Sequence, residues 1–198
     1  MKKNNVVRID KRWEETKVLL ISDLHWDNPK CDRELLKKHL DEALKGNHDI
    51  LINGDLFCLM QGAYDPRKSK SDIRPEHNSA NYFDAIINTA VDWFTPYAHL
   101  IKLVAYGNHE TAILKRQETD IIERFVTLLN YKTGSDIQVG GYGGWIRIQF
   151  DDGSSTQSFK IKYMHGFGGG GAVTRGTIQH NRMSVNVEGA DAIWMGHV

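Results

Sequence analysis

Cysteine is scarce in this sequence, and charge of neither sign is in excess. Its 198 residues include only two cysteines, Cys31 and Cys58, which lack C-x-x-C spacing. They exclude a disulfide framework and favour a reducing compartment. Lysine plus arginine and aspartate plus glutamate both total 25, so the formal net charge is zero. This balance excludes a globally basic surface for nucleic acid, although local basic loops remain possible.

Long hydrophobic runs are absent as well. No stretch approaches the roughly 18 apolar residues that a membrane-spanning helix requires. Residues 1–5 carry positive charge, but no apolar run follows them, so they do not match a signal peptide. We therefore predict a cytoplasmic protein without a membrane partner. The length predicts one domain over residues 1–198, with a sizeable core.

Apolar periodicity predicts a mixed α/β chain. The expected strands cover 6–9, 17–21, 49–53, 100–105 and 191–195, and the expected helices cover 32–44, 80–94, 119–129 and 177–187. Asp32 is the expected N-cap of the first helix, and Gly46 its expected C-terminal stop. Between 136 and 164 the chain becomes β-rich. Turn sequences at 140–141 and 151–153 predict antiparallel hairpins there, the first of which could have a longer connection.

Short polar motifs follow five of the apolar runs. They are Asp23-Leu24-His25, Gly54-Asp55, Gly107-Asn108-His109-Glu110, His165-Gly166 and Gly196-His197. Open α/β sheets bind ligands at the carboxyl ends of their strands, so we expect these side chains to meet at one edge. Asp23 and His25 are two residues apart and point the same way in an extended chain, and Asp55 has two oxygens with which to bridge two cations. The sequence therefore predicts a binuclear metal site.

The expected ligand atoms are nitrogen and oxygen, without a thiolate. Such a set favours Mn, Fe or Zn over Cu(I), Ca or an iron–sulfur cluster. Two cations about 3.5–4 Å apart activate a bridging water and clamp the attacking and leaving oxygens of a phosphoryl displacement. We therefore expect hydrolysis of a phosphate monoester or diester by a hydroxide that bridges two metals.

The ordered motifs resemble those of the calcineurin-like metallophosphoesterases, D-x-H, G-D, G-N-H-[DE], H-G and G-H-x-H. The resemblance spans residues 17–198. It implies a four-layer fold, in which a sandwich of two β-sheets is flanked by helices and the site lies on one sheet edge. It also implies that His109 is catalytic beside Asp55 and either protonates the leaving oxygen or stabilises the transition state. The implied ligands are Asp23, His25 and Asp55 for one metal and Asp55, Asn108, His165 and His197 for the other, with Mn favoured.

Two features depart from the family pattern. The sequence stops at Val198, before the closing His of G-H-x-H and the C-terminal strands of the family. This predicts either a fragment of a longer protein, which we favour, or a weakly held first metal. The connection between Asp55 and Asn108 is also unusually long, and its polar segment 57–79 is an expected excursion that could gate the site or select substrate. Within it His77 is a candidate substrate contact. Arg175, beyond the glycine tract 166–171, is another.

Two other interpretations of the function stay open, and the oligomeric state is not predicted. The sequence Gly54-Asp55-Leu56-Phe57 resembles that of DNA-repair nucleases in the same family. A basic cluster could hold a nucleic-acid strand; it comprises Arg67, Lys68, Lys70 and Arg74. A non-catalytic scaffold of this fold would be expected to lose His109 or several ligands, which this chain keeps.

Two look-alike motifs are rejected as functional elements. Residues 46–49 repeat the G-N-H-D pattern, but they lie between a helix end and a strand start, at the wrong edge of the sheet. The glycine tract 166–171 lacks the G-K-[ST] ending of a nucleotide-binding P-loop.

Overall fold

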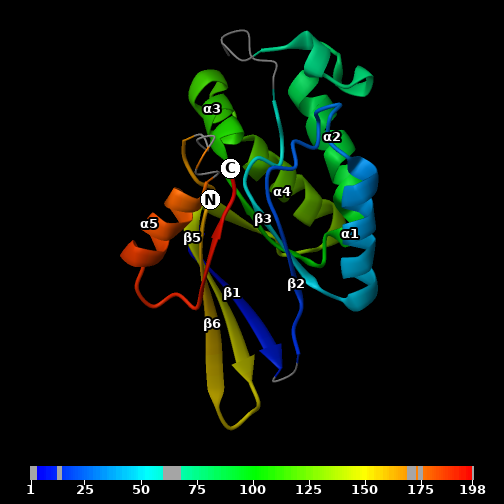
Figure 1. Cartoon of the computed structure of the whole chain (residues 1–198). Coiled ribbons are helices and arrows are strands. Elements are labelled where there is room, and N and C mark those ends of the chain that lie inside the picture. Colours follow the sequence, from blue (N-terminus) through cyan, green and yellow to red (C-terminus); the bar gives the residue numbers. More distant parts are fainter. Residues whose placement is uncertain (1–3, 13–14, 60–67, 169–172, 174–175, 198) are drawn as a thin grey trace.

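A curled mixed sheet with helices around it forms the body of the molecule (Figure 1). The computed structural model describes residues 4–12, 15–59, 68–168, 173 and 176–197. The strands are β1 (Asn4–Arg12), β2 (Val18–Ile21), β3 (Asp49–Asn53), β4 (Ile101–Ala105), β5 (Gln138–Asp151), β6 (Thr156–Met164) and β7 (Ala192–Met195). The α-helices are α1 (Arg33–Gly46), α2 (Tyr82–Phe94), α3 (Asn108–Gln117), α4 (Ile121–Thr133) and α5 (Thr177–Asn186). Three short 3-10 helices join them: η1 (Lys70–Asp72), η2 (Pro75–His77) and η3 (Thr95–Tyr97).

Strands β2, β3 and β4 pair in parallel and form the first arm of the sheet. Every residue of β3 is buried, because its two faces pack against different cores. Side chains alternate between the faces of a strand. Ile50 and Ile52 therefore join the helical core formed with α1, α2 and α4, whereas Leu51 joins the core inside the curl. A continuous apolar run is what such a doubly covered strand requires.

The second arm contains β1, β6, β7 and most of β5. Strand β5 pairs in parallel with β4 through Gln138 and Val139, and then antiparallel with β6 from Gly143 to Asp151. Strand β1 pairs with β5 and β7 pairs with β6, both in parallel. Ile146 and Tyr163 of this arm pack against Leu51 and Leu103 of the first arm. The predicted α/β fold is thus confirmed, but the two expected sheets are joined through β5 into one.

The predicted hairpin at residues 140–141 is wrong, because β5 runs straight through these glycines. A Cβ atom on Gly140 would lie 2.4 Å from the Tyr163 hydroxyl and 2.6 Å from Leu103 Cδ1. Glycine is therefore needed there for the strand to pass close to both arms. The predicted hairpin at 151–153 is confirmed. It joins β5 to β6, and the Asp152 carboxylate accepts hydrogen bonds from the Ser154 and Ser155 backbone amides.

The helices differ from the prediction in two ways: the residue that ends α1, and the presence of α3. Asp32 caps α1 as predicted, since its carboxylate accepts from the Leu35 amide at 2.9 Å. The helix ends on Asn47, which adopts a left-handed backbone with φ 50°, and not on a glycine. Helix α3 was not expected at all. It begins at Asn108, directly after β4, and within it only Glu110 and Ile113 are buried, so its hydrophobic pattern is weak.

The long connection after β3 is partly described. Residues 60–67 of the expected excursion, including Arg67 of the basic cluster, lie outside the described residues. Residues 68–79 contain η1 and η2, and they pack onto the loop that follows β2. The Arg74 guanidinium donates to the backbone carbonyls of Asn28 and Cys31 at 3.1 Å each. This segment is therefore attached to the loop that carries Asp23 and His25.

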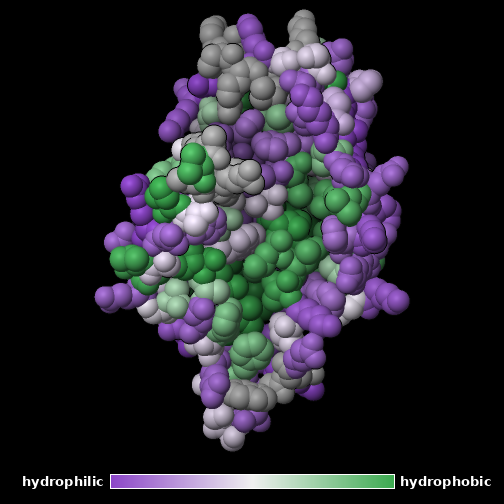
Figure 2. All heavy atoms as spheres, viewed as in Figure 1, coloured by the Kyte–Doolittle hydropathy of each residue, from purple (hydrophilic) through white to green (hydrophobic). Residues whose placement is uncertain are grey.

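Strands β2 and β7 are the two borders of the sheet path. Figure 2 shows hydrophobic side chains gathered on the surface between them, and Leu20 of β2 is 41% exposed. In the part of the chain that the structure describes, no helix is long and apolar enough to cross a membrane.

Candidate metal centre

Strand ends from both arms meet at one edge of the curled sheet. Asp23 and His25 follow β2, and Asp55 follows β3. His165 and His197 follow β6 and β7 of the second arm. Ligand atoms of Asp23, Asp55, His165 and His197 all lie within 4.8 Å of one another. The structure therefore brings together acidic and imidazole groups that are up to 174 positions apart in the sequence.

His165 is fully buried at the centre of this group. Its Nδ1 lies 2.9 Å from the Asn53 carbonyl, and because a carbonyl only accepts, Nδ1 carries the proton. The lone pair of Nε2 therefore faces the site. This atom lies 3.2 Å from Asn108 Oδ1, 3.3 Å from Asp55 Oδ2 and 4.0 Å from Asp23 Oδ1. A backbone carbonyl that fixes the tautomer of a histidine is the usual support of a metal ligand.

Asp55 is the carboxylate that all the imidazoles approach. Its Oδ1 accepts from the His109 backbone amide at 2.9 Å. Its Oδ2 lies 3.9 Å from Nε2 of both His25 and His109. Gly107 packs directly against this carboxylate. A Cβ atom added at Gly107 would lie 2.0 Å from Asp55 Oδ1. The G-N-H motif therefore needs its glycine for Asp55 to reach the site.

Charge coupling within the centre shows that it is suited to a cation. Burial opposes the charged forms of Asp55 and His165, but their mutual hydrogen bond and charges outweigh it. The pKa of Asp55 is consequently lowered and that of His165 is raised. Carboxylates that stabilise an imidazolium would stabilise a metal cation for the same electrostatic reason. Oxygen and imidazole donors at these distances thus fit a divalent metal.

Four of the site residues have an unusual backbone. Asp23, His25, Asp55 and His197 have φ values between 44° and 55°. This left-handed region is uncommon outside glycine, although Asp and His tolerate it better than most residues. Strained conformations of this kind cluster at functional sites and persist where surrounding contacts hold them. Here the Asp23 and His25 amides donate to the Gly54 and Asp55 carbonyls at 3.1 and 3.0 Å.

Two buried carboxylates, for which no supporting role was predicted, hold the loops of the site. Glu110, which is 1% exposed, accepts from the backbone amides of Asp55, Phe57 and Gly107 at 3.1, 3.0 and 2.9 Å. Burial, followed by the charge of Asp55, raises the pKa of Glu110. Asp27 accepts from the amides of Cys58 and Leu59 at 2.5 and 2.9 Å. Acidic residues inside or beside apolar runs were the available signal, but sequence does not show which amides they face.

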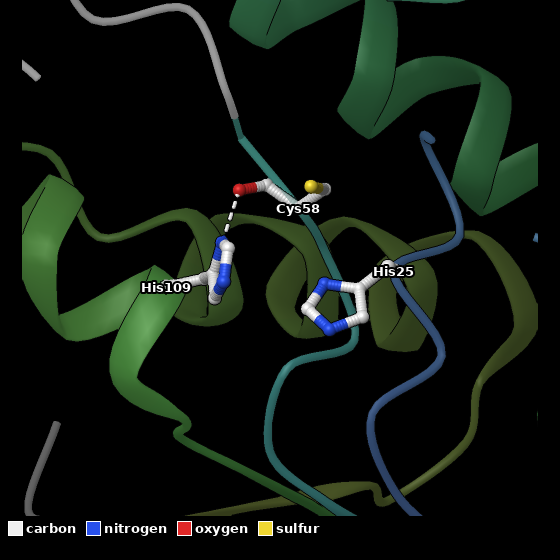
Figure 3. Close-up of side chains that lie close together, drawn as sticks. All are labelled: His25, Cys58 and His109. Atoms are coloured by element: carbon white, nitrogen blue, oxygen red, sulfur yellow. Dashed lines mark hydrogen bonds between the residues drawn. The ribbon is translucent and has the colours of Figure 1, made fainter. Parts of the chain in front are cut away.

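His109 lies beside the carboxylate cluster on the first turn of α3. Its Nδ1 donates to the Cys58 carbonyl at 2.5 Å (Figure 3). Its Nε2 lies 3.9 Å from Asp55 Oδ2. The rings of His25 and His109 stand edge to face, with centroids 4.7 Å apart. Both line an open pocket of about 490 Å³, together with Asp23 and Cys58. A ligand in this pocket would meet the imidazole of His109 directly.

Of the two candidate substrate contacts, only His77 is among the described residues, and it lies away from the site. His77 is 0% exposed, 2.9 Å from the Thr89 hydroxyl and stacked near Trp26, with ring centroids 5.6 Å apart. Burial lowers its pKa, as expected for a histidine packed in the helical core. Arg175 lies outside the described residues. His48 of the look-alike motif sits beside the end of α1, where its amide donates to the Ala43 carbonyl.

Comparison with known proteins gives one match. The model of the calcineurin-like phosphoesterase family matches residues 16–198. The chain belongs to this family. Membership implies a metal-dependent hydrolase of phosphoester bonds, and the calcineurin-like resemblance predicted from the motifs is confirmed. No curated protein and no solved structure matches the chain.

Proposed function

We propose that this calcineurin-like phosphoesterase hydrolyses a phosphate monoester or diester with two divalent cations. The observation that supports this most directly is the cluster of Asp23, Asp55, His165 and His197, with His109 beside it. Both arms of the sheet supply site residues, so we further propose that residues 1–198 act as one domain.

The two cations would share Asp55. Asp23 and His25 would complete the first set of ligands, and His25 Nε2 lies 3.9 Å from Asp55 Oδ2. Asn108, His165 and His197 would hold the second cation, and Asn108 and His165 already lie 3.2 Å apart. His197 is also tied to the first set, because its amide donates to Asp23 Oδ2 at 3.0 Å. The absence of thiolate from this donor set favours Mn, with Fe or Zn as alternatives.

The chain would contribute both charge stabilisation and a proton. Bound divalent cations would lower the pKa of a shared water, so that it supplies hydroxide at neutral pH, and would neutralise the phosphate. His109, with both ring nitrogens protonated, would protonate the leaving oxygen through Nε2, while its Nδ1–H donates to the Cys58 carbonyl. Asp55 would hold that imidazole in place by accepting the His109 backbone amide.

The test is Mn-stimulated hydrolysis of an aryl phosphate by purified variants. We expect Asp55→Asn and His109→Ala each to lower kcat/KM by about 10²–10⁴-fold, the size of a lost general acid or charge-stabilising group. His39→Ala, at an exposed position of α1, is the control and should keep the wild-type rate. Wild-type rates in both site variants would contradict the proposed function.

A nuclease remains the alternative within the family, although the described part of the basic cluster gives it little support. Arg74 is tied to two backbone carbonyls and is not available to bind phosphate freely. DNA binding that falls steeply with salt would favour the nuclease, and no binding at low salt would dismiss it. We also propose a cytoplasmic setting, which the presence of only two cysteines, without C-x-x-C spacing, favours.

A further inference from the structure

The thiol of Cys58 lies beside the two histidines on the pocket side of the centre (Figure 3). Ligand atoms of His25, Cys58 and His109 are all within 4.8 Å of one another. In a tetrahedral zinc site, bond lengths of about 2.0–2.3 Å separate neighbouring ligand atoms by roughly 3.6 Å. An approach of about 1 Å, which small side-chain rotations provide, would therefore enclose a cation. These three residues form a group separate from the cluster of Asp23, Asp55, His165 and His197.

The surrounding hydrogen bonds prepare this group to bind a metal. The Asn28 side-chain amide donates to Cys58 Sγ at 3.2 Å, so the sulfur is held in place beside the two imidazoles. His109 donates its Nδ1 proton to the Cys58 carbonyl, so Nε2 is the ring nitrogen that would bind a cation. His25 Nδ1 is buried and has no hydrogen-bond partner among the described residues. A buried ring nitrogen without a partner is costly unless a ligand satisfies it. The pocket of about 490 Å³ that these residues line gives a cation access.

We propose that His25, Cys58 and His109 form an inhibitory site for thiophilic divalent cations such as Zn²⁺ or Cd²⁺. Thiolate and imidazole ligands select such ions, whereas Mn²⁺ prefers carboxylate and carbonyl oxygens. Binding deprotonates the Cys58 thiol, and the proton passes to solvent. The fourth position around the cation stays open to water from the pocket.

Occupation of this site would stop catalysis, and that consequence rests on the proposed function. A neutral imidazole has a single lone pair. His25 bound beside Cys58 therefore cannot also hold the cation at Asp55, and a metal-bound His109 cannot donate a proton. Hydrolysis would proceed with Mn²⁺ and would be inhibited by a soft ion added to the Mn²⁺-loaded protein.

The first experiment measures binding without hydrolysis. Metal-stripped protein is titrated with Cd²⁺ while the ultraviolet charge-transfer band of a cadmium–thiolate bond is recorded. We expect a saturable band in the wild type and in Cys31→Ser, and none in Cys58→Ser. Cys31 is the matched control, because it lines the same pocket and is the only other cysteine of the chain. A band that persists in Cys58→Ser, or that Cys31→Ser removes, would overturn the proposed site.

The second experiment measures inhibition of Mn-stimulated hydrolysis by Zn²⁺. Measured against its own rate without Zn²⁺, Cys58→Ser should need at least about ten times more Zn²⁺ for half inhibition than the wild type does. Equal sensitivity of Cys58→Ser and wild type would overturn the inhibitory role. If no variant hydrolyses the substrate, the proposed function fails, whereas the cadmium band still decides whether the thiolate site exists.

Discussion

At the scale of single residues, Glu110 decides how the metal centre is built. Its carboxylate gathers three backbone amides from the loops after β3 and β4, and thereby fixes Asp55 relative to His109. The sequence predicted the ligand-type residues because they follow apolar runs in a recognisable order. It could not predict Glu110 or Asp27 as supports, because their partners are backbone amides that only the folded loops bring into range.

Glu110→Gln should destabilise the protein, since a neutral amide accepts more weakly and directs two N–H donors at other donors. We expect the free energy of unfolding of metal-stripped protein to fall by about 1–3 kcal/mol. Urea denaturation followed by circular dichroism measures this loss. Glu42→Gln on the exposed face of α1 is the control and should change stability by less than about 0.5 kcal/mol. Equal urea midpoints for the two variants would contradict the supporting role of Glu110.

At the scale of elements, β5 is where sequence reasoning failed most clearly. Paired glycines between apolar stretches are typical of a hairpin, but here they let one long strand pass between two arms. The difference depends on Tyr163 and Leu103, which are distant in sequence and occupy the space that a side chain at 140 would need. Helix α3 was missed for a related reason: it buries little, so its apolar periodicity is weak. Strands and helices with a strong apolar pattern were predicted well.

Gly140→Ala should destabilise the junction between the arms. The added methyl group would overlap the Tyr163 hydroxyl and Leu103, and such overpacking typically costs about 1–3 kcal/mol. Gly143→Ala is the comparison within the same strand, because its Cβ atom would come no closer than 3.1 Å to another atom, the Tyr163 carbonyl oxygen. We expect a clearly smaller loss there. Similar urea midpoints for the two variants would contradict the packing argument.

At the scale of the whole molecule, the metal centre connects the two arms. Asp23, His25, Asp55 and Asn108 belong to the first arm, and His165 and His197 to the second. Strand β5 pairs with strands of both arms and is their covalent and hydrogen-bonded junction. Cations bound between the arms would add a further junction, next to the hydrogen bond that the Asn53 side chain donates to the Met164 carbonyl. Metal binding and stability of the fold should therefore be linked.

Removal of metal should lower the thermal stability. At a Mn²⁺ concentration 100 times its dissociation constant, binding contributes about 2.7 kcal/mol. For a chain of this size that corresponds to a rise of roughly 5–10 °C in Tm, which a chelator should abolish. Differential scanning calorimetry measures the shift, and Asp55→Asn should show little of it. A wild-type Tm that changes with neither Mn²⁺ nor chelator would refute the link between metal binding and stability.

The position of each ligand strand within the sheet has a last consequence. Asp55 follows β3, which has a paired neighbour on both sides, whereas Asp23 and His197 follow the border strands β2 and β7. Border strands fray before interior ones, because fewer hydrogen bonds must break. Asp55 is therefore held more firmly than the outer ligands Asp23 and His197. Brief fraying of a border would release an outer ligand while Asp55 stays in place, and this offers a route for cations to enter and leave without unfolding the molecule.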